Sequence, residues 1–137
     1  MRITKHFILN EFVVSKDHPE LVTDKITELD LYKLWFICST ILEPLRLREI
    51  GPIKILSGKR SKALNKAVGG SITSDHLFEH LSCAVDFTVI KKPIGWCFDW
   101  IKANLPYSFG QLIFYPDKNF IHVSLPTPKH LGESFIQ

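Results

Sequence analysis

Two apolar segments in the second half of the chain each carry one ionisable residue in their middle. Asp86 lies within AVDFTV (84–89), and His122 lies within FIHVSL (120–125). The β-branched and aromatic residues of both segments predict strands. An ionised carboxylate inside such a strand is costly unless it is paired or binds a metal. The fold must therefore bring partners to Asp86.

The other elements follow from apolar periodicity and turn signals. A broad apolar face predicts a helix over 29–48, which Pro44 should end or kink near Leu42 or Glu43. Residues 1–28 are expected to form short segments with a turn at 17–19. After the long helix we expect a strand at 53–56, a helix at 61–67 with Ser61 as its N-cap, a strand at 83–89, a helix at 93–104, and strands at 111–115 and 120–125 joined by a turn at 116–119. Helices that precede strands in this way predict an α+β fold, with N-terminal helices packed on a small antiparallel β-sheet.

Size and composition predict one domain over 1–137. The chain has 45% hydrophobic and 23% charged residues, which excludes a disordered chain. The net charge of +3 is too small to indicate a nucleic-acid partner, and no apolar run is long enough to span a membrane. The first residues lack the apolar core of a signal peptide, so we expect synthesis in the cytoplasm of the host cell. Three widely spaced cysteines in apolar surroundings are predicted to be buried and reduced: Cys38, Cys83 and Cys97.

A third ionisable residue can join the two strand residues. His76 follows a glycine-rich stretch, VGGSITS at 68–74. Two imidazoles and one carboxylate that leave a coordination position open are a known catalytic zinc arrangement. We therefore predict a Zn²⁺ site made of His76, Asp86 and His122.

A second zinc motif overlaps the first. His76-Leu77-Phe78-Glu79-His80 spells H-x-x-E-H, in which two histidines share one face of a helix and the glutamate acts as a base. That architecture needs a long helix at this point, whereas a strand is expected from residue 83 onward.

Several motifs in order resemble those of a known enzyme family. They are KHFILNEF (5–12), LEPLR (42–46), SGKRSKALNKAVGGSITSDH (57–76), AVDF (84–87), FGQLIFYP (109–116) and FIHVSLP (120–126). The chain resembles the small zinc D-alanyl-D-alanine carboxypeptidase-type peptidases, a group that includes vancomycin-resistance D,D-dipeptidases and phage L-alanyl-D-glutamate endolysins. It is most similar to the short branch found in phages.

The resemblance implies roles for individual residues. It makes His76, Asp86 and His122 the zinc ligands and Arg60 the residue that holds the substrate peptide. A guanidinium suits this task because its fork matches a carboxylate or a polarised carbonyl. We expect Arg60 to be exposed, so that its replacement affects turnover and leaves zinc content and stability nearly unchanged.

The chain departs from the family pattern S-x-H-x-x-G-x-A-x-D near the first ligand. His76 and Asp86 are ten residues apart, which implies an insertion within LFEHLSC, and an alignment on His80 is the alternative. The acidic general base of the family is also missing from its usual places on the 111–125 hairpin. Asp117 is the first candidate for the base and Glu79 the second, while Tyr115 could support an oxyanion.

The resemblance implies a hydrolase, namely a zinc metallopeptidase that cleaves peptidoglycan stem peptides in cell wall degradation. Its reaction would be that of a D-Ala-D-Ala carboxypeptidase or of an L-Ala-D-Glu endopeptidase. A bacteriophage endolysin of this kind would reach the cell wall after lysis-related release, or from a virion through a virion partner. The alternative is a cell-wall-binding or virion-structural module that keeps the fold but has lost turnover.

Overall fold

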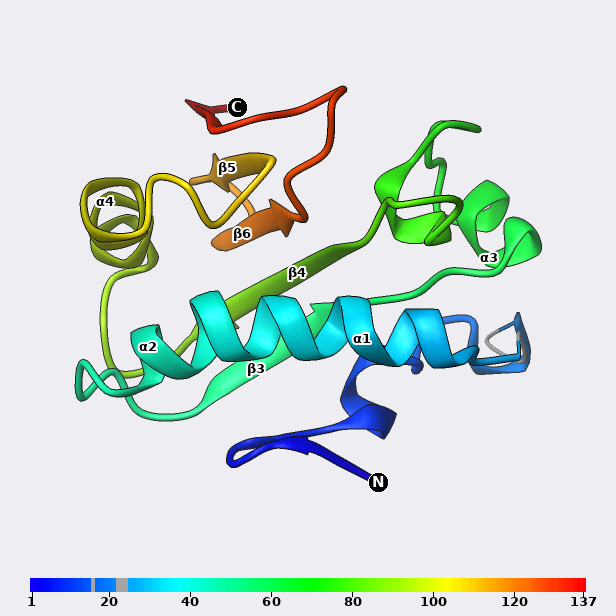
Figure 1. Cartoon of the computed structure of the whole chain (residues 1–137), viewed down its shortest axis with the longest axis horizontal. Helices are drawn as coiled ribbons and strands as arrows, with labels where there is room; N and C mark the ends of the chain where they lie inside the picture. The colour runs from blue at the N-terminus through cyan, green and yellow to red at the C-terminus, as the bar shows by residue number, and fades with distance from the viewer. Residues whose placement is uncertain (16, 22–24) are drawn as a thin grey trace.

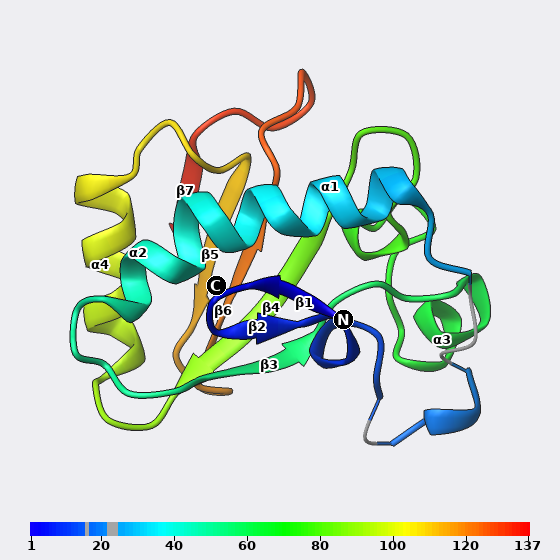
Figure 2. The same ribbon diagram turned by 60° about the horizontal axis from the view of Figure 1, so that its bottom comes forward.

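The computed structural model describes residues 1–15, 17–21 and 25–137, and a five-stranded sheet lies at its centre. The strands run in the order β3-β4-β6-β5-β7 (Figures 1 and 2). Their bounds are β3 Ile53–Ser57, β4 Ala84–Val89, β5 Gln111–Tyr115, β6 Phe120–Ser124 and β7 Glu133–Ile136. The four strands that the sequence predicts are therefore present and pair antiparallel.

The expected all-antiparallel sheet is wrong at one edge. β7 pairs parallel with β5, and Gln111 lies beside Glu133 in that register. The strand was not predicted because it is short and mostly exposed, so it lacks the alternation of apolar and polar residues that marks a half-buried strand. Figure 2 shows the loop after β6 turning back to place β7 beside β5.

The long predicted helix is continuous but irregular. It consists of α1 (Glu28–Ile37), a π-helical segment at Cys38–Leu42 and α2 (Glu43–Arg46). Pro44 lies in the first turn of α2, where its missing N–H is tolerated, so the prediction that it ends the helix is wrong. The π-helical segment Cys38–Leu42 ends immediately before α2, at the place where an end or kink of the helix was expected.

The described fold also has three short 3-10 helices, η1 (Leu9–Phe12), η2 (Pro19–Leu21) and η4 (Asp75–Leu77). Two further α-helices and a small hairpin complete it. They are α3 (Lys62–Ala67), α4 (Ile94–Asn104) and the paired strands β1 (Arg2–Thr4) and β2 (Phe7–Ile8). Ser61 caps α3 as predicted, because its Oγ accepts a hydrogen bond of 2.9 Å from the Leu64 amide. The hairpin falls within the first 28 residues, for which only short segments were expected.

One buried apolar cluster joins the helices to the sheet. The rod formed by α1 and α2 crosses the sheet, and α4 lies beside its α2 end (Figures 1 and 2). Residues from every layer are buried in the cluster, among them Leu34, Ile41, Val85, Ile101 and Ile121. All three cysteines are free and buried as predicted, and burial raises the pKa of the Cys38 thiol to about 12. No helix in the described part of the chain is long and apolar enough to cross a membrane.

Candidate metal centre

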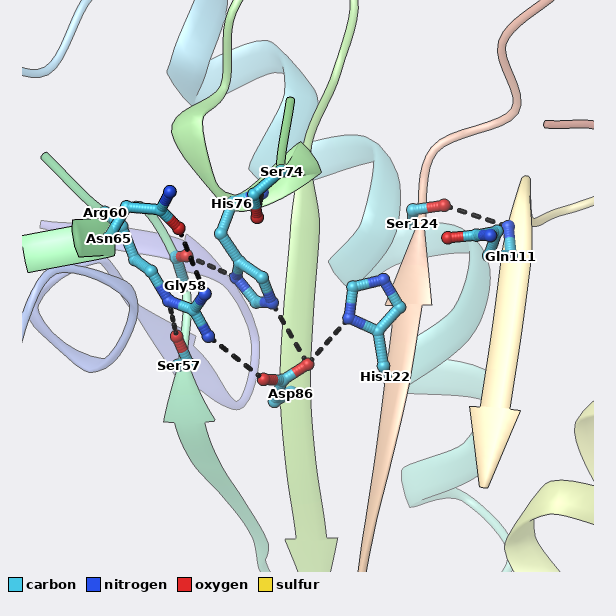
Figure 3. A network of polar contacts seen from close by, with 10 residues as sticks. All are labelled: Ser57, Gly58, Arg60, Asn65, Ser74, His76, Asp86, Gln111, His122 and Ser124. Atoms are coloured by element: carbon cyan, nitrogen blue, oxygen red, sulfur yellow. Dashed lines mark hydrogen bonds and ion pairs between the residues drawn. The ribbon is translucent and has the colours of Figure 1, made fainter. Parts of the chain in front are cut away.

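Asp86 and His122 occupy the same row of the sheet. They are direct partners in the antiparallel register of β4 and β6. Because side chains alternate along a strand, both project from the face opposite to Val85 and Val123, which belong to the core. His122 Nδ1 lies 2.9 Å from Asp86 Oδ1 (Figure 3). The two polar residues inside apolar strands therefore serve one site.

His76 reaches the same carboxylate from a loop. It lies in the 3-10 turn Asp75–Leu77, and its side chain is only 4% exposed. Its Nδ1 lies 2.8 Å from the carbonyl oxygen of Gly58, which can only accept, so Nδ1 carries the proton. The other ring nitrogen, Nε2, lies 3.1 Å from Asp86 Oδ1 (Figure 3).

Arg60 contacts the other oxygen of Asp86. Its Nη2 lies 3.6 Å from Oδ2, its Nε donates to Ser57 Oγ at 3.2 Å, and its Nη1 donates to Asn65 Oδ1 at 3.3 Å (Figure 3). The side chain is 16% exposed, so the expectation of an exposed arginine is wrong. Burial lowers the pKa of the guanidinium, and the Asp86 charge opposes that effect. The remaining Nη–H groups are left for a ligand.

The electrostatics of Asp86 favour its ionised form. Burial raises the pKa of this carboxyl, but the charges of His76 and His122 and the hydrogen bonds from both outweigh burial, so the pKa lies well below its usual range. One carboxylate oxygen and one nitrogen from each histidine lie within 4.8 Å of one another. Such a nitrogen and oxygen donor set fits Zn²⁺, and the bond from His76 to the Gly58 carbonyl is the kind of outer contact that orients a ligand histidine.

A cavity of about 410 Å³ opens over these residues. Besides the three residues and Arg60, basic and aromatic side chains line it, among them Tyr115, Lys118, Lys129 and His130. Tyr115 stacks on Phe120 with ring centroids 4.5 Å apart. Burial and the Asp86 charge raise the pKa of Tyr115, so its hydroxyl stays protonated and can donate a hydrogen bond. The cavity suits an anionic or strongly polarised ligand.

The helix required by the H-x-x-E-H motif is absent from this described segment. Phe78 and His80 have positive φ angles of 57° and 52°, which end any helical turn after Leu77. His80 and Glu79 are exposed, and neither is among the described residues that line the cavity. The hypothesis that H-x-x-E-H at 76–80 forms a helical zinc motif is therefore wrong. His76, and not His80, joins the cluster with Asp86 and His122.

The first base candidate lies outside the described lining as well. Asp117 is exposed in the turn between β5 and β6, and Asn119 closes that turn with a φ of 55°. Its role as a base stays a prediction. His130 and its neighbour Glu133 were missed by sequence reasoning, because they follow the last recognisable motif in a segment without clear periodicity.

Residue 58, whose carbonyl accepts the hydrogen bond from His76, packs so closely against Phe12 that only glycine fits there. A Cβ at residue 58 would lie 2.3 Å from the backbone oxygen of Phe12, a contact that forces the backbone to shift. Gly58→Ala is expected to destabilise the fold by about 1–3 kcal/mol and to lower zinc affinity by roughly 10–100-fold. Thermal unfolding and competition with a zinc chelator measure the two effects.

Gly69→Asn is the matched control for this substitution. No atom lies within 4 Å of a Cβ at residue 69, and asparagine tolerates its φ of 76°. If Gly58→Ala binds zinc as tightly as Gly69→Asn, the Gly58 carbonyl does not orient His76.

One of the comparisons with known proteins gave a match. A family model described as Peptidase M15 matches residues 5–124, which include His76, Asp86 and His122. The comparisons with curated proteins and with solved structures gave no match.

Proposed function

Since the chain belongs to the peptidase M15 family, a family of zinc-dependent peptidases, we propose that it hydrolyses the stem peptides of bacterial peptidoglycan. The observation that carries the proposal is the convergence of His76, Asp86 and His122 beneath a cavity that Arg60 also lines. We propose that the whole chain acts as one peptidase domain. Its reaction would be that of a D-Ala-D-Ala carboxypeptidase or of an L-Ala-D-Glu endopeptidase.

In this proposal His76, Asp86 and His122 would hold the zinc ion, each through one ligand atom. The bound ion supplies a Lewis acid that polarises the scissile carbonyl and lowers the pKa of water. Arg60 binds a carboxylate or carbonyl of the peptide through the Nη–H groups that Ser57, Asn65 and Asp86 leave available. The protonated hydroxyl of Tyr115 is suited to donate to the oxyanion that develops on the substrate.

The biological setting belongs to the same proposal. Peptidoglycan stem peptides carry free carboxylates, which the basic residues Arg60, Lys118 and Lys129 of the cavity would attract. We propose a phage-encoded enzyme that reaches the cell wall during lysis or entry.

Mass spectrometry of muropeptides tests the proposal. Zinc-loaded protein is incubated with purified peptidoglycan and with soluble stem peptides, and His122→Ala serves as the control. We expect the wild type alone to release D-alanine or to cleave the L-Ala-D-Glu bond, and the mass of the product identifies the bond. Equal product profiles for the wild type and His122→Ala would contradict a zinc-dependent hydrolase.

One observation favours a second candidate function. Neither Asp117 nor Glu79 is among the described residues that line the cavity, so the carboxylate base expected of the family has no counterpart among those two. A cell-wall-binding or virion-structural module would keep the fold and the metal without turnover. Binding of the wild type to peptidoglycan sacculi, with no product from any stem peptide, would support this alternative.

A further inference from the structure

We propose that His130, oriented by Glu133, accepts the proton of the attacking water in this chain. The inference rests on the proposed peptidase function and deepens it, because it names the base that the hydrolysis requires. Hydrolysis of a peptide bond needs a proton acceptor within hydrogen-bond reach of the water. Among the described residues of the cavity lining, and outside the three proposed zinc ligands, His130 is the one histidine and Asp75 the one carboxylate. Histidine and carboxylate side chains are the commonest general bases.

The geometry of the His130 ring suits a base. Its Nδ1 lies 3.0 Å from Glu133 Oε2, and an ionised carboxylate can only accept, so Nδ1 donates. Hydrogen bonding from His130 lowers the pKa of Glu133, which keeps the carboxylate ionised. In the described part of the chain no protein atom bonds Nε2, and the residue lines the same cavity as the metal centre. A carboxylate that holds one ring nitrogen so that the other can take a proton is the arrangement of histidine bases in hydrolases.

Glu133 is itself fixed at the edge of the sheet. Its Oε2 lies 3.3 Å from Gln111 Nε2, and the parallel register of β5 and β7 places these two residues side by side. Its amide donates to the Gly110 carbonyl at 2.9 Å. Gln111 also lines the cavity, so this contact joins Glu133 to the wall of the site.

The loop that carries His130 packs tightly on the start of β5. Thr127 and His130 exchange backbone hydrogen bonds of 3.0 and 3.1 Å, and the Gly132 amide donates to the Phe109 carbonyl. A Cβ on Gly110 would lie 2.8 Å from the His130 carbonyl oxygen, so the loop approaches β5 as closely as a glycine permits. The position of His130 is therefore set by the backbone on both sides of it.

The pair of His130 and Glu133 lies outside the part of the chain that matches the family model. His130 and Glu133 lie beyond residue 124, where the match to the family model ends. Asp75 is the competing base, but in the described structure no side chain bonds its carboxylate, and it precedes His76 directly in a tight turn. The His130 side chain is oriented by its hydrogen bond to Glu133, and among the described residues the Asp75 carboxylate has no such partner.

His130 would carry one proton from the attacking water to the leaving nitrogen. The water oxygen forms a bond to the carbonyl carbon while one water proton moves to His130 Nε2. The imidazolium, stabilised by the Glu133 carboxylate, then gives that proton to the leaving nitrogen as the C–N bond breaks. The products are a carboxylic acid and an amine, and His130 returns to its neutral form.

Turnover of a stem peptide by zinc-loaded variants tests the inference. We expect His130→Gln to lower kcat by at least about 100-fold while KM changes little, because the lost group acts on the water. Glu133→Gln should lower kcat by a smaller factor through misorientation of the ring. Zinc content and thermal unfolding, measured on the same samples, should match the wild type in both variants.

Two readouts separate a base from a structural histidine. Added imidazole should restore part of the turnover of His130→Gly, after correction for its effect on the wild type, and should not restore His122→Ala. Carbethoxylation of His130 in the wild type, followed by peptide mass spectrometry, should be slowed by a bound product peptide, since His130 lines the cavity.

Each failure points to a different conclusion. Full turnover in His130→Gln, or a large loss confined to Asp117→Asn or Asp75→Asn, overturns the role of His130 and leaves the peptidase intact. Absence of any product from the wild type on every stem peptide overturns the proposed function and this inference with it. Carbethoxylation that bound product does not slow shows that His130 lies outside the substrate site and also overturns the inference.

Discussion

His76→Ala is expected to abolish stoichiometric zinc binding, whereas His80→Ala retains it. His76 Nε2 lies 3.1 Å from Asp86 Oδ1 beneath the cavity, and His80 is exposed outside the cluster. Removing a ligand should cost more than the roughly 100-fold in affinity that removal of an outer-shell contact can cost. Elemental analysis of dialysed protein measures the zinc content, and turnover of a stem peptide should fall in parallel.

The two histidines form a matched pair for this test. Both lie in the segment between the glycine-rich loop and β4, so general damage to that segment would affect both variants. Loss of zinc in His80→Ala with full zinc in His76→Ala would identify His80 as the ligand and contradict the role of His76.

Arg60→Ala is expected to lower kcat/KM by at least tenfold, which corresponds to about 1.4 kcal/mol of transition-state stabilisation. The guanidinium lines the cavity and is held by Ser57, Asn65 and Asp86, so its direction toward a ligand is fixed. Because Arg60 also contacts Asp86 at 3.6 Å and is mostly buried, the variant should lose some thermal stability as well. The measurement is steady-state kinetics at saturating zinc.

Arg60→Lys separates charge from shape. Lysine keeps the positive charge near Asp86 but lacks the planar fork, so it should recover stability more fully than kcat/KM. Unchanged kcat/KM in Arg60→Ala at full zinc occupancy would make Arg60 a structural partner of Asp86 and remove it from substrate binding.

Several features of the fold were predictable because they repeat along the chain. The apolar, β-branched and aromatic residues of β4 and β6 predict strands that are mostly buried, and against them Asp86 and His122 stand out as exceptions. The helical spacing of residues 29–48 predicts the rod of α1 and α2, although Pro44 does not interrupt it. The tolerance of a proline depends on its exact place in a turn, which apolar spacing does not report.

The conformation of residues 76–80, and which of their histidines joins the site, was harder to predict from sequence. The H-x-x-E-H motif and the His76 alignment assign the same letters to different conformations. The choice depends on the hydrogen bond from His76 to the Gly58 carbonyl and on the left-handed residues Phe78 and His80. These are contacts between distant segments and local backbone angles, and neither leaves a periodic signal.

The sequence by itself determined the central pair of the site, because Asp86 and His122 are polar residues in strands that must otherwise be buried. Only the tertiary structure decided what surrounds that pair. It placed His76 beside Asp86 by a hydrogen bond to the Gly58 carbonyl, and it buried Arg60 against the same carboxylate. It also placed β7 parallel to β5, where Glu133 bonds His130 at the cavity. The physical reason is that the apolar residues within a helix or strand indicate which of its positions are buried. The position of a loop side chain depends instead on the backbone groups of remote segments with which it forms hydrogen bonds.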